Sequence, residues 1–386
     1  MKSKVAVIPC QGYDEFKVNE AIKKGISLLG GWESFVKPEE KILLKPNLLN
    51  RADVERAVTT HPAVFRAVAR NLLDNGYLNV TYGDSPGHPG SVEKTAEACG
   101  IKAVADDLQI ALADFAQSKT IDYVHGRTSR RFEISQGVLD SDAIINICKM
   151  KTHQLERITG AVKNMFGCVH GIHKGAAHVK YPDAESFAKM LIDLNFYLKP
   201  RLHIMDGIVA MEGNGPASGN PVNMNVILMS GDPVALDSTF CRLVNLNPAE
   251  VPTVYYGSIY GLGNWENDKI EIVGVDDLIY YCNPKFDVAR EKKYSGKWAV
   301  IGRLASVEKR PVILKKKCIR CGACIRACPL EEKALYFPET SGSTKPRIAE
   351  KGVPVYNYKK CIKCYCCQEM CPERAIVVKR KFIPFI

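Results

Sequence analysis

The sequence carries little that would mark a secreted or membrane-spanning protein. Its first ten residues, MKSKVAVIPC, contain an apolar run of only five residues before Gln11, Asp14 and Glu15. Such a run is shorter than the apolar region of a signal peptide and far shorter than a membrane span. We therefore expect a cytoplasmic protein with no membrane contact.

Common nucleotide-binding and metal motifs are also missing. No G-x-G-x-x-G opens the first expected helix, which argues against a dinucleotide bound in that way. The glycine-rich stretch MEGNGPASGNP lacks the G-x-x-x-x-G-K-[ST] order of a P-loop. The eight histidines form no HExxH motif and no H-x-x-x-H pair, so the simplest zinc sites are excluded.

What is present is a chain of two unlike parts. Of its 386 residues, 46% are hydrophobic and 25% are charged, as in ordinary globular proteins. Residues 1–289 hold 30 Lys and Arg against 34 Asp and Glu, whereas residues 290–386 hold 23 against 8. We predict an α/β ligand-binding domain over residues 1–300 and a small ferredoxin-like domain over residues 301–386.

Nine of the 15 cysteines lie between Cys318 and Cys371, and in a reducing cytoplasm such a cluster indicates metal rather than disulfides. CIRCGACIRACP (318–329) and CIKCYCCQEMCP (361–372) both read C-x-x-C-x-x-C-x-x-x-C-P, the bacterial spacing for two [4Fe-4S] clusters. The fourth cysteine of each run then ligates the other cluster. We predict one cluster on Cys318, Cys321, Cys324 and Cys371, and the other on Cys361, Cys364, Cys367 and Cys328.

Two points about these cysteines stay open. Structural zinc is the alternative to iron–sulfur clusters, although it usually has two C-x-x-C pairs around a longer loop. Cys366 is surplus to both predicted sets and is interpreted as a spare thiol.

The lysines of this C-terminal part have two explanations. Eight thiolates and two oxidised clusters together contribute about −4, which part of the positive charge offsets. The remaining basic runs, at residues 315–317, 359–360 and 379–381, suit docking of an acidic electron-transfer protein such as a ferredoxin or flavodoxin. Nucleic-acid binding is the weaker alternative, because no aromatic residues alternate with the charges.

Residues 1–290 alternate short apolar strands with helical stretches, which predicts an α/β fold with a mainly parallel sheet and helices on both faces. The expected strands are KVAVIP (4–9), KILLK (41–45), NVTY (79–82), AIINIC (143–148), LHIM (202–205) and NVILMS (225–230). Helices are expected from about Asp14 to Leu29 and from Pro62 to Asn75, each followed by a glycine. IDYVHG and RRFEIS are expected to form a hairpin.

Polar turns follow five of these strands, beginning at Lys45, Gly83, Lys149, Asp206 and Gly231. The carboxyl ends of parallel strands share one edge, where open α/β folds bind ligands. We therefore predict a ligand site at this edge, and its lysines suggest an anionic ligand such as a carboxylate or phosphate. The candidate binding residues are Lys45, Asn47, Thr60, Ser85, Lys151, Asn164, Asp206 and Glu212.

One of these turns opens a cationic run, residues 149–178, that holds four of the eight histidines. An apolar stripe at helical spacing predicts that part of the run is a helix, with Glu156, Thr159 and Lys163 on its polar face. The stripe consists of Leu155, Ile158, Val162, Met165 and Val169. A metal site could form from His153, His170, His173 and His178, although proton transfer is preferred. The candidate catalytic residues are Lys163, His153, His178 and Asp84.

Seven short motifs occur in the order found in a known family. They are KPN (45–47), TTHP (59–62), GDSPG (83–87), KMKTH (149–153), TGAVKNMFG (159–167), DGIVAMEGNGP (206–216) and DPVALD (232–237). On these motifs the chain resembles, over essentially its whole length, the family called domain of unknown function 362, which is often joined to a two-cluster ferredoxin module. The resemblance implies the fold and the iron–sulfur association but no reaction.

The cationic run also has a distant likeness to the catalytic domain of nickel-pincer lactate racemases. In that family a histidine precedes a cofactor-bearing lysine by ten residues, and a further histidine ligates nickel. His153, Lys163 and His178 resemble this set, but the family's glycine-glycine-arginine before the lysine reads Gly160-Ala161-Val162 here. We therefore do not expect the nickel cofactor, and infer from the likeness only that the run faces a small-molecule site.

These features predict an iron–sulfur oxidoreductase that passes electrons from an acidic redox partner through two [4Fe-4S] clusters to an anionic small molecule or cofactor at the sheet edge. Lys163, Lys45 and Lys151 would hold its charge, and His153 or His178 would supply protons. Two alternatives stay open: a non-catalytic electron-transfer or cofactor-maturation protein, and a racemase- or isomerase-like enzyme with a structural ferredoxin. The substrate, the direction of electron flow, any flavin and the oligomeric state stay open as well.

Overall fold

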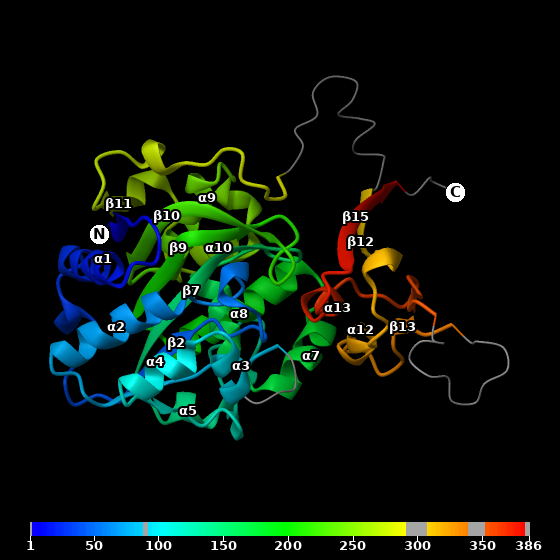
Figure 1. The fold of residues 1–386 in the computed structure, drawn as a ribbon, viewed down its shortest axis with the longest axis horizontal. Coiled ribbons are helices and arrows are strands. Elements are labelled where there is room, and N and C mark those ends of the chain that lie inside the picture. The colour runs from blue at the N-terminus through cyan, green and yellow to red at the C-terminus, as the bar shows by residue number, and fades with distance from the viewer. Residues whose placement is uncertain (1, 88–91, 291–306, 339–351, 383–386) are drawn as a thin grey trace.

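The computed structural model describes residues 2–87, 92–290, 307–338 and 352–382. The predicted domain boundary near residue 300 lies outside these residues. Figure 1 shows a large α/β part and, beside it, a small part formed by the last strands and helices of the chain. We call them the α/β domain (residues 2–290) and the C-terminal module (residues 307–382).

A nine-stranded sheet forms the centre of the α/β domain, in the order β11-β1-β10-β9-β7-β2-β3-β4, with β8 beside β7. Its strands are β1 (Ser3–Pro9), β2 (Ile42–Pro46), β3 (Val80–Tyr82), β4 (Ala111–Leu112), β7 (Ala143–His153), β8 (Arg157–Thr159), β9 (Leu202–Glu212), β10 (Asn220–Ser230) and β11 (Ile270–Val273). β10 is antiparallel to both neighbours and β8 to β7, while the other five pairs are parallel. The predicted mainly parallel sheet is confirmed.

Helices cover both faces of this sheet, as predicted (Figure 1). They are α1 (Glu15–Leu28), α2 (Pro62–Asp74), α3 (Val92–Ala98), α4 (Ile101–Asp107), α5 (Gln136–Leu139), α6 (Ala161–Asn164), α7 (Gly171–Lys180), α8 (Ala184–Leu198), α9 (Pro233–Leu243) and α10 (Pro252–Ile259). None of the helices in the described ranges is long and apolar enough to cross a membrane. The predicted hairpin is also present, as β5 (Ser118–Asp122) paired with β6 (Arg131–Ser135).

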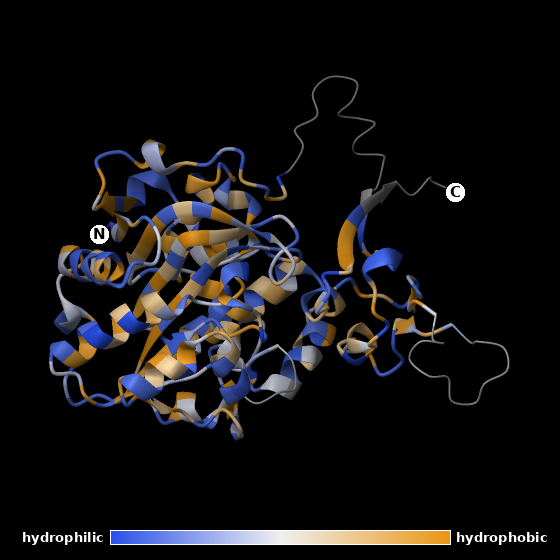
Figure 2. Ribbon diagram, in the orientation of Figure 1, coloured by the Kyte–Doolittle hydropathy of each residue, from blue (hydrophilic) through white to orange (hydrophobic). Residues whose placement is uncertain are grey.

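The two faces of the sheet build two separate hydrophobic cores. Ile42 and Leu44 of β2 belong to the core under α1 and α2, whereas Leu43 belongs to the core under α8 and α9. The reason is that successive side chains of a strand point to opposite faces. Figure 2 shows apolar residues along the central strands and mixed colours along the covering helices.

Local capping explains why two predicted helices begin where they do. The Asp14 carboxylate accepts from the backbone N–H of Lys17 at 3.0 Å, at the start of α1. Pro62 occupies the first position of α2, and Nδ1 of His61 accepts from the N–H of Ala63 at 3.1 Å. Such contacts satisfy the N–H groups that a helix start leaves unpaired. Both helices end within one residue of the predicted limits.

β7 is the strand that organises the edge of the sheet. All of its 11 residues, AIINICKMKTH, are buried, so the strand continues past its predicted end at Cys148. Its polar tail stays buried because the amines of Lys149 and Lys151 both have hydrogen-bond acceptors. Burial of a charge is tolerated when the group is paired in this way.

The helix expected from the apolar stripe in residues 155–169 is only partly present. The segment instead contains β8, the short α6 and a 3-10 turn at Met165–Cys168, before α7 begins. Gly160 marks the change of direction, since a Cβ there would lie 2.0 Å from Oδ1 of Asp237. That carboxylate accepts from the N–H groups of Ala161 and Val162 at 2.6 and 3.1 Å. The stripe reflects burial of several short elements rather than one helix.

The expectation that the turn at Gly231 lies at the ligand edge is wrong. β10 follows β9 as its antiparallel neighbour, so its carboxyl end points to the opposite edge of the sheet. There Asp232 caps α9 by accepting from the N–H groups of Val234 and Ala235 at 2.8 and 2.9 Å. The glycine-rich residues 211–221 connect these two strands instead of crossing over the sheet.

The C-terminal module rests on the carboxyl edge of the sheet. Its strands pair as β12 (Val307–Ile313) with β15 (Ile376–Phe382) and β13 (Leu335–Tyr336) with β14 (Val355–Tyr356), and its short helices are α12 (Ala323–Arg326) and α13 (Cys366–Glu369). Gln368 of α13 donates to the backbone oxygen of Asn214 at 2.7 Å, and Asn214 Nδ2 donates to the oxygen of Ile376 at 2.9 Å. Asn214 lies between β9 and β10, so this connection is a docking point for the module.

Candidate functional site

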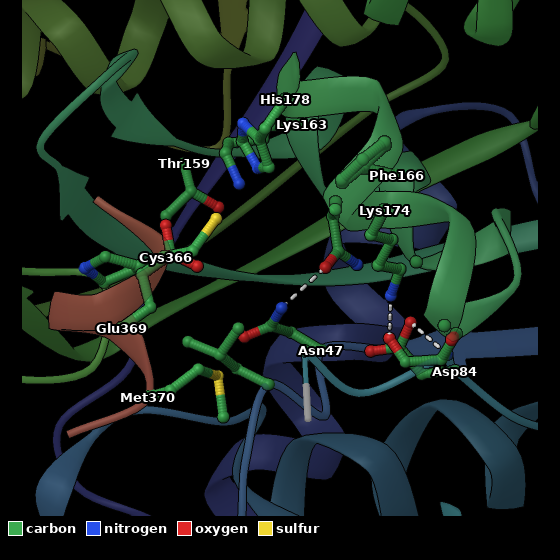
Figure 3. A pocket seen from close by; sticks show the side chains of 18 of the residues that line it. Asn47, Asp84, Thr159, Lys163, Phe166, Lys174, His178, Cys366, Glu369 and Met370 are labelled. Carbon is green, nitrogen blue, oxygen red and sulfur yellow. Dashed lines mark hydrogen bonds between the residues drawn. The ribbon is translucent and has the colours of Figure 1, made fainter. Parts of the chain in front are cut away.

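A cavity of about 250 Å³ lies between the α/β domain and the C-terminal module. We call it the interface pocket. From the α/β domain it is lined by Asn47, Asp84, Ser85, Lys151, Lys163, Asn164, Lys174 and His178, among others, and from the module by Arg326, Ala327, Cys366, Glu369 and Met370. Figure 3 shows labelled side chains of both parts converging on this one space.

The sequence-predicted site residues fall into three groups in the structure. Those that line the interface pocket are Asn47, Asp84, Ser85, Lys151, Lys163, Asn164 and His178. Those that stand behind it, in contact with a lining residue, are Lys45, Thr60 and His153. Asp206 and Glu212 do not line it: Asp206 pairs with Lys149, and Glu212 accepts from the N–H of Asp287 at 2.8 Å.

Lys45 and Asp84 form a buried ion pair at the ends of β2 and β3. Lys45 Nζ lies 2.9 Å from Oδ1 of Asp84, and both side chains are almost fully buried. The Asp84 carboxylate also accepts from the N–H groups of Leu48 and Ser85 at 2.6 and 3.0 Å. Gly167 covers the pair so closely that a Cβ there would lie 1.8 Å from the carboxylate. The charge of Lys45 is thus paired inside the wall, and Asp84, not Lys45, lines the interface pocket.

Lys151 reaches the interface pocket from the tail of β7. Its amine donates to Oδ1 of Asn47 and to the backbone oxygen of Val58, both at 2.7 Å. Thr60 holds Asn47 in place, because its hydroxyl accepts from the Asn47 N–H at 2.9 Å. Burial lowers the pKa of Lys151 to about 7, and the positive charge of Lys163 adds to the shift. At neutral pH this amine can therefore release or take up a proton.

Lys163 is a cation of the interface pocket that has no partner among the described residues. It lies half-buried on α6 in the wall of the interface pocket. Within the described ranges, no residue forms a hydrogen bond or ion pair with its amine. Its charge contributes to lowering the pKa of His153, His178 and Glu369. An unpaired ammonium in a pocket is an arrangement that favours an anion.

Lys174 is a further lysine of the cationic run that lines the pocket and that the sequence analysis did not single out. Its amine donates to the backbone oxygen of Ser85. Burial lowers its pKa to about 8. The signal available in the sequence was only its place in a run of lysines and histidines.

His178 presents a neutral imidazole to the interface pocket. Its ring stacks on Phe187 with centroids 4.4 Å apart and meets the edge of Phe166 at 6.0 Å. Burial lowers its pKa to about 4. Its Nδ1 is buried and has no hydrogen-bond partner among the residues that the structure describes. This nitrogen is therefore available to a further polar group.

His153 lies behind the pocket, where it joins the α/β domain to the module. Its Nδ1 accepts from the N–H groups of Leu155 and Glu156 at 3.1 and 3.0 Å. The proton must then sit on Nε2, which donates to Oε1 of Glu369 at 3.1 Å. Burial lowers the pKa of His153 to about 4. In this geometry His153 holds Glu369, which lines the pocket, and does not reach the ligand space itself.

A second buried network lies beside the pocket and was missed because it centres on Tyr13. Lys149 Nζ donates to Oδ2 of Asp206 at 2.7 Å and to the Tyr13 hydroxyl at 2.9 Å, and that hydroxyl donates to Oδ1 of Asp206 at 2.9 Å. The ring of Tyr13 stacks on His61 at 3.4 Å. Every charge in the network is paired, so we interpret it as support for the sheet edge. Tyr13 follows the strand β1, and this position at a strand end is the sequence signal that could have predicted the network.

The eight predicted cysteine ligands divide as the sequence motif implies. One small cavity is lined by Cys318, Cys321, Cys324 and Cys371, and another by Cys328, Cys361, Cys364 and Cys367. Four thiols around an enclosed space are a donor set that fits an iron–sulfur cluster. In the described ranges, no three His, Cys, Asp or Glu side chains form a group able to hold a single metal ion. His153, His170, His173 and His178 are accordingly not gathered into a metal site.

Cys366, interpreted from sequence as a spare thiol, is part of the wall of the interface pocket. It stands between Cys364 and Cys367, and Figure 3 shows it close to Thr159 and Glu369 in projection. Ala327 and Met370 also line the pocket, directly before Cys328 and Cys371. Residues adjoining both predicted cysteine sets therefore border the same space as Lys163 and His178.

Comparison with known proteins identifies both parts. Residues 42–242 match the family model described as domain of unknown function (DUF362). The chain belongs to the DUF362 family. Residues 310–372 match the model of a 4Fe-4S dicluster domain, so this DUF362 protein carries an iron–sulfur domain in the C-terminal module. The resemblance inferred from the seven motifs is confirmed.

The proteins that this DUF362 chain resembles do not assign a reaction to it. The thylakoid-associated protein sll1697 of Synechocystis sp. is 34% identical over 256 residues, which are 66% of this chain and 78% of that protein. The lactate racemase apoprotein of Thermoanaerobacterium thermosaccharolyticum matches at 12% identity and a TM-score of 0.42, over 63% of this chain and 57% of that one. A Thermotoga maritima protein matches at 12% identity and 0.36, over 64% and 60%. This chain thus spans less than two thirds of either solved chain.

Proposed function

We propose that this DUF362 protein is an oxidoreductase that reduces a small anionic molecule in the interface pocket with electrons from an acidic redox protein. The observation that carries the proposal is the double lining of one cavity. Lys163 and His178 come from the sheet edge, while Ala327, Cys366 and Met370 come from the two cysteine runs. A ligand there would contact a cationic binding wall and the immediate surroundings of the cysteines together.

Two [4Fe-4S] clusters, one on each cysteine set, would supply one-electron transfer at a strongly reducing potential. The chain's own contribution is to place the ligand beside them. Cys366 and Ala327 each adjoin a cysteine of the second set, Cys367 and Cys328, and both line the pocket. This proximity supports electron transfer to a ligand bound directly in the pocket.

The size of the interface pocket limits what it can hold. Its 250 Å³ is the room of roughly eight water molecules at about 30 Å³ each, and it lies below the roughly 300–1,000 Å³ of typical drug-sized ligand sites. Leu49, Phe166 and Met370 give the lining an apolar portion. These features suit a small carboxylate or phosphate with a short apolar body. The interface pocket shares Ser85, Arg326 and Ala327 with a neighbouring cavity of about 900 Å³, into which a larger ligand would extend.

The protonation states modify the roles expected from the sequence. His153 and His178 both have pKa values lowered to about 4 by burial. At neutral pH both rings are therefore neutral and have no imidazolium proton to donate. Lys151 lines the pocket with a pKa of about 7, close to the value that suits a proton donor near neutral pH. We therefore propose that Lys163 pairs with the negative charge of the ligand, that His178 forms a hydrogen bond with it, and that Lys151 supplies the proton.

The test uses the anaerobically purified full chain with its iron and sulfide measured. Its clusters are kept reduced by excess dithionite, pools of small organic acids and phosphates are offered, and the consumption of dithionite, the electron source, is followed by absorbance. We expect repeated turnover by the natural chain and by Lys24→Met, an exposed lysine on α1. Lys163→Met should lower turnover at least about tenfold, because it removes the unpaired cation that binds the ligand.

Three results would contradict parts of the proposal. A single stoichiometric oxidation with every pool would identify an electron carrier rather than an enzyme. Equal turnover in Lys163→Met and Lys24→Met would mean that Lys163 does not hold the ligand. Conversion of a pool member at the same rate with oxidised clusters and no reductant, measured as product formed, would make the iron–sulfur domain structural.

A further inference from the structure

The two cysteine sets differ in their exposure to solvent. In the first set Cys321 is exposed, and Cys318 and Cys371 are half-buried. In the second set Cys328, Cys364 and Cys367 are all buried, and only Cys361 is half-buried. The first set therefore lies nearer to the surface, whereas the second supplies most of the neighbours of the interface pocket.

The surface beside the first set is basic with an apolar centre. We call it the donor face: Lys315, Lys316, Lys317, Ile319, Arg320 and Cys321, all of them exposed. Ile319 leaves 55% of its surface open to solvent. Among the described residues that line the cavity of the first set, Glu373 is the acidic one, whereas the donor face carries three lysines and one arginine.

The surface beside the second set has a smaller excess of positive charge. Lys333, Lys359 and Lys360 are exposed there, and Lys363 lines the cavity of this set. Glu331 and Glu332 are exposed on the same side, where Glu332 pairs with Lys360, and Lys333 donates to the backbone oxygen of Cys328 at 2.7 Å. Charge of both signs is therefore mixed on this side, which makes it the weaker docking surface for an acidic protein.

We propose that the donor face is where an acidic electron-transfer protein docks, and that this chain receives electrons on the side of the Cys318 set and uses them on the side of the Cys328 set. Transient electron-transfer contacts are small, and opposite charge speeds their formation. Each encounter moves one electron: the donor protein is oxidised by one, this chain is reduced by one, and no bond forms or breaks. The inference rests on the proposed function and locates the surface on which its electron-donating partner would dock.

The test compares two variants that each remove two positive charges from the module. Lys315→Gln/Lys316→Gln alters the donor face, and Lys359→Gln/Lys360→Gln alters the other side. The full chain with assembled clusters is mixed with a reduced, acidic plant-type ferredoxin at low salt, and cluster reduction is followed by stopped flow. Binding of the oxidised ferredoxin is measured separately by titration calorimetry.

We expect the donor-face variant to be reduced roughly three- to tenfold more slowly and to bind the ferredoxin correspondingly more weakly, because steering depends on local charge. The matched variant should differ from the natural chain less than twofold, and the difference between the two should shrink at high salt. Equal effects, a larger effect at Lys359 and Lys360, or no reaction with the ferredoxin at all would each overturn the inference. Cluster reduction and ferredoxin binding are both measured without a substrate. A failure to find turnover would therefore contradict the proposed function without changing the outcome of this docking test.

Discussion

In and behind the wall of the interface pocket, the fold decides whether the charge of a lysine is paired, unpaired or buried. Lys45 is neutralised by Asp84, whereas Lys163 faces the cavity with no partner in the described part of the chain. Lys151 is buried with neutral acceptors only, Asn47 and Val58. In the proposed function, three lysines of one edge therefore have different roles: Lys45 is part of the wall, Lys163 binds the ligand and Lys151 carries a proton.

Lys151 makes a prediction about the pH dependence of stability. Its pKa is about 7 in the folded chain against an ordinary 10.5, so between these values the unfolded chain binds one more proton. The free energy of unfolding then rises with pH across this window, by at most about 1.4 kcal/mol per unit from this group. Denaturant unfolding from pH 7.5 to 9.5 should show a steeper rise in the natural chain than in Lys151→Met. Parallel curves would show that Lys151 is charged throughout this range.

Among the elements, β7 and the short segments after it decide the shape of the site. The strand carries two lysines into the interior. α6 and the turn at Met165–Cys168 then place Lys163 in the pocket wall and Gly167 against Lys45 and Asp84. Gly167 matters because Asp84 and Lys45 occupy the space where a side chain would stand. This part of the run therefore brings the backbone close to the ion pair of Lys45 and Asp84.

Two glycines that line the pocket provide a matched test of that approach. In Gly167→Ala the new Cβ would lie 1.8 Å from Asp84 Oδ1, whereas in Gly171→Ala the nearest atom is Ser85 Oγ at 3.4 Å. We expect the first to lower the free energy of unfolding by about 2 kcal/mol or more, with a thermal midpoint several degrees lower. The second should keep the natural midpoint in differential scanning calorimetry. Similar midpoints for both would mean that the ion pair moves aside freely.

At the scale of the whole molecule, the C-terminal module depends on the α/β domain and on what its cysteines hold. Its hydrophobic core has six buried residues, of which Cys324, Cys328 and Cys367 are predicted ligands. A core of this size cannot by itself offset the entropy of ordering the module. Ligand binding by the cysteines would supply the missing stability.

Removal of iron should therefore unfold the module and spare the larger domain. After anaerobic chelation, hydrogen exchange by mass spectrometry should show lost protection at α12, α13 and β15, while β7 and β9 stay protected. Reconstitution with iron and sulfide should restore the protection. A module that stays protected without iron would show that its docking contacts, such as Gln368 to Asn214, are sufficient.

The sequence by itself determined six of the nine strands that the described residues form in the sheet, together with the first two helices, because these depend on local periodicity and capping. It also grouped the cysteines as they lie around two cavities, because that grouping depends on spacing within a few residues. It also placed Asn47, Asp84, Lys151, Lys163 and His178 at one edge of a sheet. It did not determine the direction of β10, since an apolar strand reads the same whichever way its neighbours run. Only the tertiary structure decided which lysine lacks a partner, that His153 contacts Glu369, and that Cys366 faces the ligand space. Those outcomes depend on contacts between residues up to 216 positions apart, which no local pattern encodes.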